Sequence, residues 1–328
     1  MSANERTASP RPLPADDLPE TDRETLAERL TYHGYAAGDR LARALSERGA
    51  RVLARVLAAT GHAMLRTVRE RVSRNQAQVL GLPQDDPLVR ASTREAFRLY
   101  LRYWVDTFRL RDLSREQVLD RMDATGLEHI TETLREGRGA IAVLPHMGNW
   151  DAAGAWIAAE GVRVVSVAEE LRPRRLFELF KRHREQVGLQ IVGLNRNGGV
   201  GRKLAGALDQ GSLVALVADR DLSGRGVPVE MFGRERTVPA GPALLSLTTE
   251  APVLVCVVST TPTGWRINIE PPIRCESTGD RRADVTALTR RLAERFEEAI
   301  ASNPADWHVF QPGWPEPRAT SEEPAAAP

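Results

Sequence analysis

His146 and Asp151 are the residues whose types and spacing first indicate catalysis. They lie in the run His146-Met-Gly-Asn-Trp-Asp151, directly after the apolar residues 140–145. A histidine that is oriented by a carboxylate is the usual general base for chemistry on a hydroxyl group. This spacing along one helix would turn the two side chains apart, but a turn at Gly148-Asn149 lets Asp151 fold back onto the imidazole. The alternative is a hydrogen-bonded histidine at a strand end, followed by an acidic helix cap.

Two further carboxylates, Asp219 and Asp221, follow the apolar residues 212–218. Ligand sites in open α/β sheets gather at the carboxyl ends of the strands, so Asp219 is a second candidate for orienting His146. The sequence leaves open whether Asp219 or Asp151 makes that contact. We therefore predict that His146, Asp219 and Asp151 are the catalytic residues.

The basic run Lys181-Arg-His-Arg184 indicates a site for phosphate or sulfate-like groups. Because guanidinium groups bind such anions through paired hydrogen bonds, we assign Arg184 to substrate binding. Arg225, Asn149 and Asp221 are predicted to bind substrate as well.

Several other chemistries do not fit the residue patterns. The chain has no GxSxG motif, so a serine hydrolase would lack its nucleophile. Residues 198–203 (GGVGRK) follow an apolar run, but they match neither the dinucleotide fingerprint nor the P-loop spacing. The six histidines show no paired spacing for a metal, and the two cysteines lie in no metal or redox motif. We expect neither a metal site nor a bound cofactor.

The candidate residues need strands that end at one edge of a sheet, and the apolar pattern predicts such strands. Short runs rich in Val and Ile alternate with segments of helical pattern, which is typical of an α/β fold with a mostly parallel central sheet covered by helices. The expected strands span 140–145, 162–168, 189–193, 212–218 and 252–259, with an alternating edge strand at 265–270. The expected helices span 151–160, 173–187, 200–210, 241–249 and 281–302.

The chain of 328 residues divides by composition into a leader, one domain and a tail. Residues 1–22 are polar and proline-rich, and 315–328 are similar, so both are expected to be disordered. Residues 23–314 are expected to form a single domain, with basic amphipathic helices at 23–75, further helix at 76–136 and the α/β core at 137–314. An aromatic stripe on a helix at 91–110 is interpreted as core packing, or else as a wall that faces acyl chains.

A local block of positive charge lies between Arg40 and Arg74, where nine arginines face two acids. Leu and Val recur among them at helical steps, and aromatic residues are scarce, which favours a membrane surface over nucleic acid. No run of apolar residues is long enough to span a bilayer. We therefore predict that residues 22–75 dock on an anionic membrane surface. The alternative is that these helices cover the sheet and leave a solvated basic face.

Together these motifs resemble the glycerolipid acyltransferase superfamily, in particular its bacterial branch with the late lipid A acyltransferases. That branch carries a histidine and a following acid, an Arg-x3-Gly, an acid-x-acid strand end and a Phe-Gly…Thr…Gly-Pro-Ala block. The matching segments are 146–151, 184–188, 219–221 and 232–243, within a resemblance over about 31–314. Within the branch the chain is most similar to the actinobacterial phosphatidylinositol mannoside acyltransferases, on segments 35–38, 103–104, 218–222 and 306–308.

The resemblance implies transfer of a fatty acyl group, typically palmitoyl from acyl-CoA, to the 6-hydroxyl of a mannose on a phosphatidylinositol mannoside. It implies that His146 is the base, that Arg184 and Arg225 hold coenzyme A phosphates, and that the protein lies peripherally on the cytoplasmic face of the cell membrane. The superfamily's Pro-Glu-Gly block is replaced by Pro239-Ala-Gly241, which argues against a glycerol phosphate acceptor. Two alternatives are a lipid A-type acyltransferase that uses acyl carrier protein, and a non-catalytic lipid-binding relative.

Overall fold

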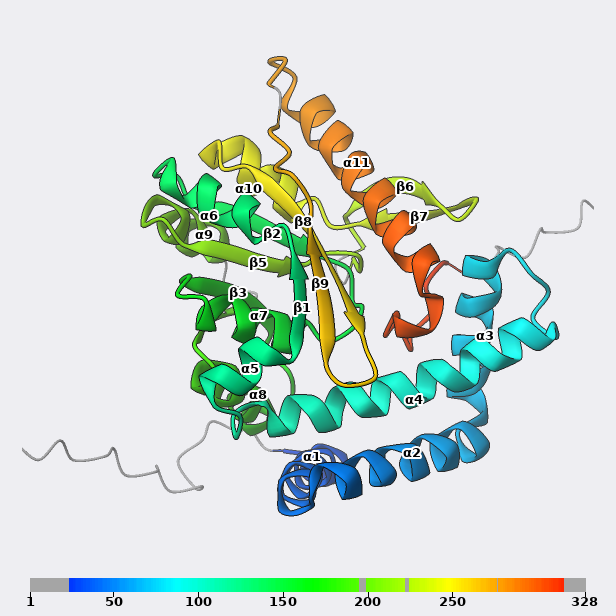
Figure 1. The fold of residues 1–328 in the computed structure, drawn as a ribbon. Helices are drawn as coiled ribbons and strands as arrows, with labels where there is room; N and C mark the ends of the chain where they lie inside the picture. Colours follow the sequence, from blue (N-terminus) through cyan, green and yellow to red (C-terminus); the bar gives the residue numbers. More distant parts are fainter. Residues whose placement is uncertain (1–23, 195–198, 222–223, 276, 316–328) are drawn as a thin grey trace, which may run out of the picture.

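A seven-stranded sheet forms the centre of the computed structural model, which describes residues 24–194, 199–221, 224–275 and 277–315 (Figure 1). Its strand order is β1-β9-β8-β2-β5-β3-β4. The strands of this sheet are β1 (Met122–Thr125), β2 (Ala140–Leu144), β3 (Val164–Glu169), β4 (Leu189–Leu194), β5 (Leu213–Val217), β8 (Val253–Thr260) and β9 (Trp265–Ile269). The predicted leader, 1–22, and all but the first residue of the predicted tail, 315–328, lie outside the described residues.

Strand direction follows the composition of each segment. The Val-rich strands β2, β3, β4, β5 and β8 are parallel, and β2 is buried at every position, as expected where helices cover both faces. β9 returns antiparallel to β8, pairs with β1 in the parallel sense, and alternates buried with exposed residues. The predicted fold class, α/β with a mostly parallel central sheet covered by helices, is confirmed.

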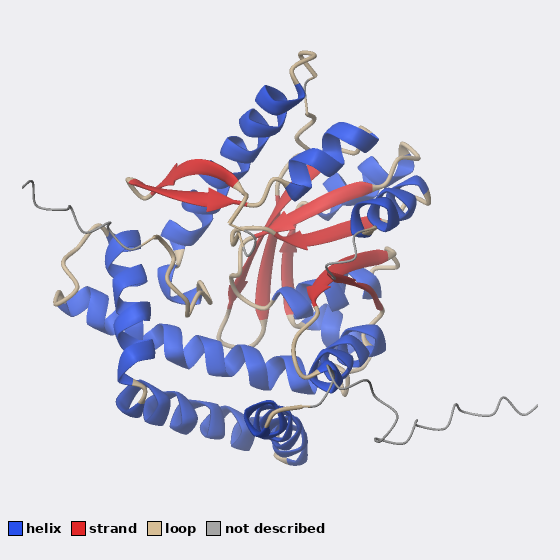
Figure 2. Ribbon diagram, turned by 180° about the vertical axis from the view of Figure 1, so that it is seen from behind, coloured by secondary structure: helices blue, strands red, loops and turns tan. Residues whose placement is uncertain are grey.

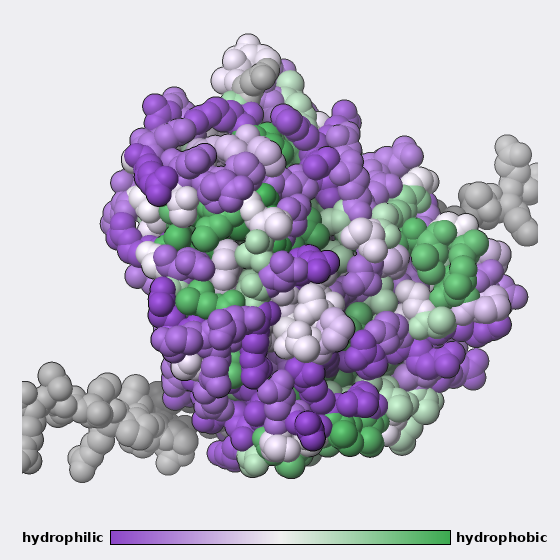
Figure 3. Space-filling model, in the orientation of Figure 1, coloured by the Kyte–Doolittle hydropathy of each residue, from purple (hydrophilic) through white to green (hydrophobic). Residues whose placement is uncertain are grey.

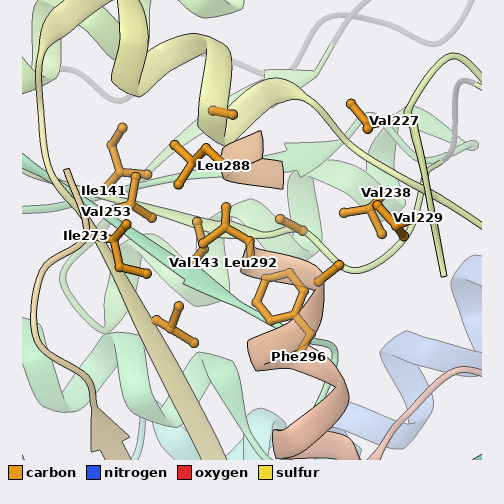
Figure 4. Close-up of a cluster of buried hydrophobic side chains, with 14 of the residues drawn as sticks. Ile141, Val143, Val227, Val229, Val238, Val253, Ile273, Leu288, Leu292 and Phe296 are labelled. Atoms are coloured by element: carbon orange, nitrogen blue, oxygen red, sulfur yellow. The ribbon is translucent and has the colours of Figure 1, made fainter. Parts of the chain in front are cut away.

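Helices pack on both faces of the sheet and enclose two hydrophobic cores. Alternate residues of β2 point into the two cores: Ile141 and Val143 face one core, and Ala142 faces the other. Figure 4 shows Leu292 and Phe296 of α11 (Arg281–Ser302) beside the first pair. Residues of α9 (Val200–Asp209) and α10 (Gly241–Thr249) join this first core, whereas α5 (Arg115–Asp120), α6 (Leu127–Arg135) and α7 (Trp150–Ala159) contribute to the second.

The N-terminal third forms a helical layer beneath the sheet in Figures 1 and 2. Its helices are α1 (Leu26–Ala44), α2 (Glu47–Met64), α3 (Arg66–Leu80) and the long α4 (Pro87–Leu110). The glycines Gly49 and Gly61, where a helix break would be expected, both lie inside α2, and the helices end instead at Leu45–Ser46 and at Leu65. The Ser46 side chain accepts a hydrogen bond from Gly49 N and so caps α2, which is why a new helix begins there.

Two pieces of the fold are absent from the sequence prediction. The short edge strand β1 carries little apolar pattern, and no strand was predicted within residues 227–238. These residues form an antiparallel hairpin of β6 (Val227–Met231) and β7 (Arg234–Val238), separate from the main sheet (Figure 2). Phe232 and Gly233 form its turn, both with positive φ, as two-residue hairpin loops require.

Candidate active site

His146 and Asp219 meet at the carboxyl edge of the sheet. β2 and β5 are neighbours with Leu144 opposite Val217, so the residues that follow each strand emerge side by side. Nδ1 of His146 lies 2.5 Å from Oδ1 of Asp219, and the same oxygen accepts a hydrogen bond from the His146 backbone N–H at 3.0 Å. The His146 side chain keeps 22% of its surface exposed, whereas that of Asp219 is fully buried. With Nδ1 on the carboxylate, the second ring nitrogen, Nε2, is left for a substrate.

Asp219 is held by more partners than the sequence suggested. Its second oxygen, Oδ2, accepts a hydrogen bond from Trp307 Nε1 at 2.8 Å, and its backbone carbonyl accepts one from Arg236 at 2.7 Å. Burial alone would raise the pKa of Asp219, but His146, the Trp307 hydrogen bond and the Arg236 charge together lower it to about 2. Asp219 is therefore an ionised carboxylate that fixes one orientation and one tautomer of the imidazole.

The segment that carries Trp307 is joined to the backbone around His146. The His308 N–H donates to the His146 carbonyl at 2.7 Å, Met147 pairs with Trp307, and the Gly148 N–H donates to the Asp306 carbonyl at 3.0 Å. Gly148 has φ of +61°, and a Cβ there would stand 2.5 Å from the Val258 carbonyl oxygen, so only glycine fits. The loop after β2 is thereby fixed in one conformation.

Asp151 does not contact the imidazole, contrary to one of the two sequence predictions. Its side chain accepts a hydrogen bond from the Tyr103 hydroxyl at 2.8 Å and forms an ion pair with Arg184, Nε to Oδ1, at 2.6 Å. Asp151 lies in the first turn of α7 and points to α8 (Arg174–Gln186), whereas His146 lies on the loop before α7. Burial would lower the pKa of Arg184, but the Asp151 charge outweighs it and raises that pKa. We therefore reassign both residues from catalysis and substrate binding to support of the wall behind the site.

The remaining predicted binding residues lie in different surroundings. Asn149 caps α7 by accepting a hydrogen bond from Ala152 N at 2.9 Å, and is buried. Asp221 accepts one from Gly226 N at 2.6 Å and so closes the loop after β5. Arg225 is exposed on that loop and lines a separate cavity. Of these three, only Arg225 therefore has a surface position suited to direct contact with a ligand.

An apolar cavity of about 60 Å³ lies between α7 and the sheet, next to the His146–Asp219 pair. Trp150 joins the two, because it lines the cavity and its ring centre is 5.4 Å from that of His146. Small side chains leave the space open, and Asp151 and Arg184 line it. The apolar lining consists of Ala142, Leu144, Ala153, Gly154, Ile157, Val164, Val167, Leu189, Ala215, Val217 and Cys256.

Phe97 of the aromatic stripe on α4 packs in the core, as one of the two interpretations of that stripe expected. Phe97 is buried in a core cluster with Ala58 and Val72, whereas Tyr103 stands beside Trp150 with ring centres 4.3 Å apart. Tyr103, which is not part of that stripe, thus reaches the wall of the site, and Phe97 fills the helical layer.

Metal or thiol chemistry finds no support in the side chains of the site. Within the described part of the chain, no group of three or more His, Cys, Asp or Glu residues is placed to hold a metal ion. Cys256 lines the apolar cavity, and burial raises the pKa of its thiol to about 12, so it stays protonated near neutral pH. His146, paired with Asp219, is placed to act as a general base.

Trp307, Arg236 and Tyr103 are functional-site residues that sequence reasoning missed. Trp307 and Tyr103 were noticed only as parts of a family resemblance, and Arg236 only as part of a loop. Arg236 is buried with its guanidinium 5.6 Å from the Trp307 ring centre and 5.4 Å from that of Trp314. Trp307 is 88 positions from Asp219, and no local pattern reports a contact across such a distance.

Comparison with known proteins agrees with this geometry. Residues 20–316 match the model of the family described as bacterial lipid A biosynthesis acyltransferase. A protein of Mycolicibacterium smegmatis named phosphatidylinositol mannoside acyltransferase is 37% identical over 299 residues, which cover 88% of this chain and 93% of the relative. A protein of Mycobacterium tuberculosis with the same name is 36% identical over 309 residues, which cover 90% of this chain and 92% of the relative. The chain therefore belongs to the bacterial lipid A biosynthesis acyltransferase family, and acyl transfer is the chemistry of its site.

Proposed function

We propose that this acyltransferase moves a fatty acyl group, palmitoyl for instance, from acyl-CoA to the 6-hydroxyl of a mannose in a phosphatidylinositol mannoside. The observation that carries the chemistry is the buried Asp219 on Nδ1 of a partly exposed His146. The names of the two mycobacterial relatives support the acceptor. The replacement of Pro-Glu-Gly by Pro239-Ala-Gly241 supports it as well, because it departs from the branch of the superfamily that acylates glycerol phosphate.

The proposed reaction needs a base for the hydroxyl but no activation of the thioester. Nε2 of His146 takes the hydroxyl proton while the sugar oxygen attacks the thioester carbonyl carbon. The tetrahedral intermediate then collapses, the carbon–sulfur bond breaks, and the thiolate takes the proton from the imidazolium. Asp219 stabilises that imidazolium, and general-base help of this kind contributes about 10²–10⁴-fold to the rate.

The negative oxygen of the intermediate needs hydrogen-bond donors. The Gly148 N–H is not available, because it donates to the Asp306 carbonyl. The amides of Trp150 and Asp151 lie in the first turn of α7, where helix geometry gives backbone N–H groups no acceptor within the helix. We assign the oxyanion to this helix N-terminus, where the helix dipole also favours negative charge.

The fatty acyl chain would enter the apolar cavity beside Trp150. The cavity of about 60 Å³ is smaller than a long acyl chain, so side chains such as Leu189 and Ile157 must move aside when the chain enters. Each buried methylene group of the chain contributes about 0.8 kcal/mol to binding, which favours that rearrangement.

Incubation of the purified protein with radiolabelled palmitoyl-CoA and a panel of lipid acceptors tests the proposal. We expect label on a mannosylated phosphatidylinositol, at the 6-hydroxyl of mannose, and none on glycerol 3-phosphate. Label on glycerol 3-phosphate instead would move the protein to a different acceptor class. Transfer only from acyl carrier protein would reject acyl-CoA as donor, and lipid binding without transfer would reject catalysis.

We further propose that α1 and α2 dock the enzyme on the anionic cytoplasmic surface of the cell membrane. Exposed aliphatic side chains recur along α2, where Val52 is 52% exposed, Val56 56% and Met64 76%, and along α1 at Leu26, Leu30 and Leu41. Figure 3 shows apolar surface over these helices at the lower edge of the molecule. Among the described residues, no helix is long and apolar enough to cross a membrane.

The arginines of this region divide into two groups. Arg43 pairs with Asp112, Arg51 with Glu47 and Arg66 with Glu70, so these charges are partly neutralised within the protein. Arg48 and Arg55 are exposed and share the outer side of α2 with Val52 and Val56. An exposed arginine contributes about 1 kcal/mol at an anionic membrane surface, in addition to the burial of the aliphatic side chains.

Vesicle co-sedimentation separates docking from a merely solvated face. Binding should require anionic lipid, weaken with salt, and fall for Arg48→Glu with Arg55→Glu, and for Val52→Ser with Val56→Ser. Arg135→Glu, an exposed charge on α6, should leave binding unchanged and is the matched control. Equal binding to neutral and anionic vesicles, or to neither, would reject the docking role.

A further inference from the structure

A cavity lined by several arginines lies away from the His146–Asp219 pair, between the hairpin, α10 and α11. Its volume is about 740 Å³, within the range of small-molecule sites. In Figures 1 and 2, α11 runs between α10 and the β6–β7 hairpin, and these three elements form the walls of the cavity. Its lining consists of Arg225, Gly226, Val227, Pro228, Leu244, Arg281, Arg282, Val285, Thr286 and Arg290.

The charge of this cavity is entirely positive. Four of its lining residues are arginines, and none is an aspartate or a glutamate. In the parts of the chain that the structure describes, Arg281, Arg282 and Arg290 form no ion pair with the protein. The two carboxylates nearest in sequence, Asp280 and Asp284, accept hydrogen bonds from Arg282 N and Thr278 N respectively. Guanidinium groups gathered around an apolar floor are suited to an anionic ligand.

The cavity is connected to the catalytic edge through a short path. Asp221 is two positions beyond Asp219 along the chain, a span of at most about 7 Å between the Cα atoms. Its carboxylate accepts a hydrogen bond at 2.6 Å from the backbone N–H of Gly226, which lines the cavity. From there the lining continues along α11 to Arg281 and Arg282 in the first turn of that helix. One wall of the cavity is therefore tied to the strand end that carries Asp219.

We propose that this arginine cavity binds the phosphate groups at the nucleotide end of the acyl donor. This assignment rests on the proposed use of acyl-CoA. Coenzyme A carries a diphosphate and a further phosphate on its ribose, joined to the thiol by a long flexible arm. Several phosphates match several arginines, and the arm would bridge the distance to His146. Arg225, which the sequence assigned to this role, is one of the four, and Arg184 is replaced by Arg281, Arg282 and Arg290.

A phosphate of the lipid acceptor is the other source of the same chemistry. The acceptor presents a single phosphodiester at the membrane surface, which would engage one or two arginines and leave the rest without a partner. The aliphatic face proposed to meet the membrane is on α1 and α2, whereas this cavity is built from β6, α10 and α11. The arginine cavity is thus better matched to the donor.

Steady-state kinetics with two donors that share one acyl group test the assignment. Decanoyl-CoA carries the phosphates, and decanoyl-pantetheine has the same thioester and arm without them. For Arg282→Glu with Arg290→Glu, we expect the KM for decanoyl-CoA to rise by about tenfold or more, since each charge-assisted contact is strong. The KM for decanoyl-pantetheine and the kcat with either donor should change by less than about twofold, because His146 and the arm-binding region are untouched.

Arg291→Glu is the matched control, because Arg291 follows Arg290 on α11 and is likewise exposed, but does not line the cavity. It should leave both KM values unchanged. The KM of the wild type for decanoyl-CoA should also rise with salt, since screening acts over about 10 Å at 0.1 M ionic strength. That dependence should be weaker in the double variant.

Three results would overturn the assignment: no change in either KM, an equal change for both donors, or a rise confined to the KM of the lipid acceptor. The last would give the cavity to the acceptor's phosphodiester. Calorimetric binding of coenzyme A itself to the wild type and the double variant decides the matter independently of turnover. If acyl transfer fails with every donor, the proposed function is wrong, whereas equal affinity of both proteins for coenzyme A shows that the arginine assignment is wrong.

Discussion

Two buried aspartates near the same helix start have opposite surroundings. Asp219 at the end of β5 faces an imidazole that is partly open to solvent, and its other oxygen is fixed by Trp307. Asp151 at the start of α7 faces the partly exposed guanidinium of Arg184 and the buried phenol of Tyr103, neither of which gives up its proton near neutral pH. Both carboxylates accept short hydrogen bonds, so the presence of strong hydrogen-bond partners does not by itself identify the aspartate that takes part in catalysis. The difference is whether the partner can pass a proton to something outside the protein.

His146→Ala should have the largest effect on catalysis, because it removes the base while leaving both aspartates in place. We expect kcat to fall by at least about 10²-fold. The variant should keep the thermal unfolding midpoint of the wild type within a few degrees, since the ring is partly exposed. Acyl transfer from radiolabelled acyl-CoA and a calorimetric scan measure the two quantities. Near-normal turnover of this variant would show that His146 is not the base, and contact with His146 would then no longer distinguish Asp219 from Asp151.

Asp219→Asn sharpens the distinction by changing charge without changing shape. The amide can no longer stabilise an imidazolium, and it can hold the ring in the wrong tautomer, so kcat should fall by about 10²-fold. The KM for both substrates should stay within about threefold, because Asp219 is buried and meets neither. A change in KM alone, with kcat preserved, would show that Asp219 shapes a binding surface instead.

Asp151→Ala should act on stability before it acts on turnover. Removal of Asp151 leaves the Arg184 charge and the Tyr103 hydroxyl without their partner, and because Arg184 is partly exposed the cost should stay below the roughly 3–5 kcal/mol of a fully buried pair. We expect a lower midpoint in denaturant-induced unfolding, and a kcat within about tenfold of wild type where the protein is folded. The double variant Asp151→Ala with Arg184→Leu should recover part of the stability. A loss of kcat equal to that of Asp219→Asn, at unchanged stability, would return Asp151 to the catalytic group.

His308→Phe tests whether the segment beside His146 is sensitive to acid. Burial is the main cause that lowers the pKa of His308, to about 3. The folded protein therefore keeps this imidazole neutral while the unfolded chain takes up a proton as the pH falls through about 6.5. Stability should then fall by about 1 kcal/mol per pH unit between pH 6 and 4.

In the Phe variant this loss should be absent, since the aromatic contacts with Tyr100, Tyr103 and Trp150 remain available. The unfolding free energies of both proteins at several pH values give the comparison. The histidines common to both proteins cancel in the difference. Parallel curves for the two proteins would show that His308 does not titrate between the folded and unfolded states.

The strands could be predicted from the sequence because their burial is local and continuous. All six strands expected from apolar runs are present within a few residues, and the loops after β2 and β5 carry His146 and Asp219 to one edge. The choice between Asp219 and Asp151 could not be made, since it depends on whether α8 supplies a guanidinium to Asp151. β6 and β7 were missed because their burial comes from packing against α11, not from an apolar run.

Arg281, Arg282 and Arg290 illustrate the same limit for surface sites. In the sequence they are ordinary charges on an amphipathic helix, whose apolar side alone carries a pattern. Their grouping with Arg225 depends on how the hairpin folds against α11, and chain positions so far apart give no hint of it. Periodicity therefore predicts what a helix buries, but not which distant charges it gathers.

The contact between Trp307 and Asp219 also bears on when the enzyme becomes active during its synthesis. Residues from both ends of the α/β region complete the site, and Trp307 is preceded by almost all of the chain. A nascent chain that has only reached β5 or the hairpin holds His146 and Asp219 but lacks the indole and the backbone pairing of residues 306–308. The site is therefore complete only after residues 306–308 have been synthesised and have paired with the segment that carries His146.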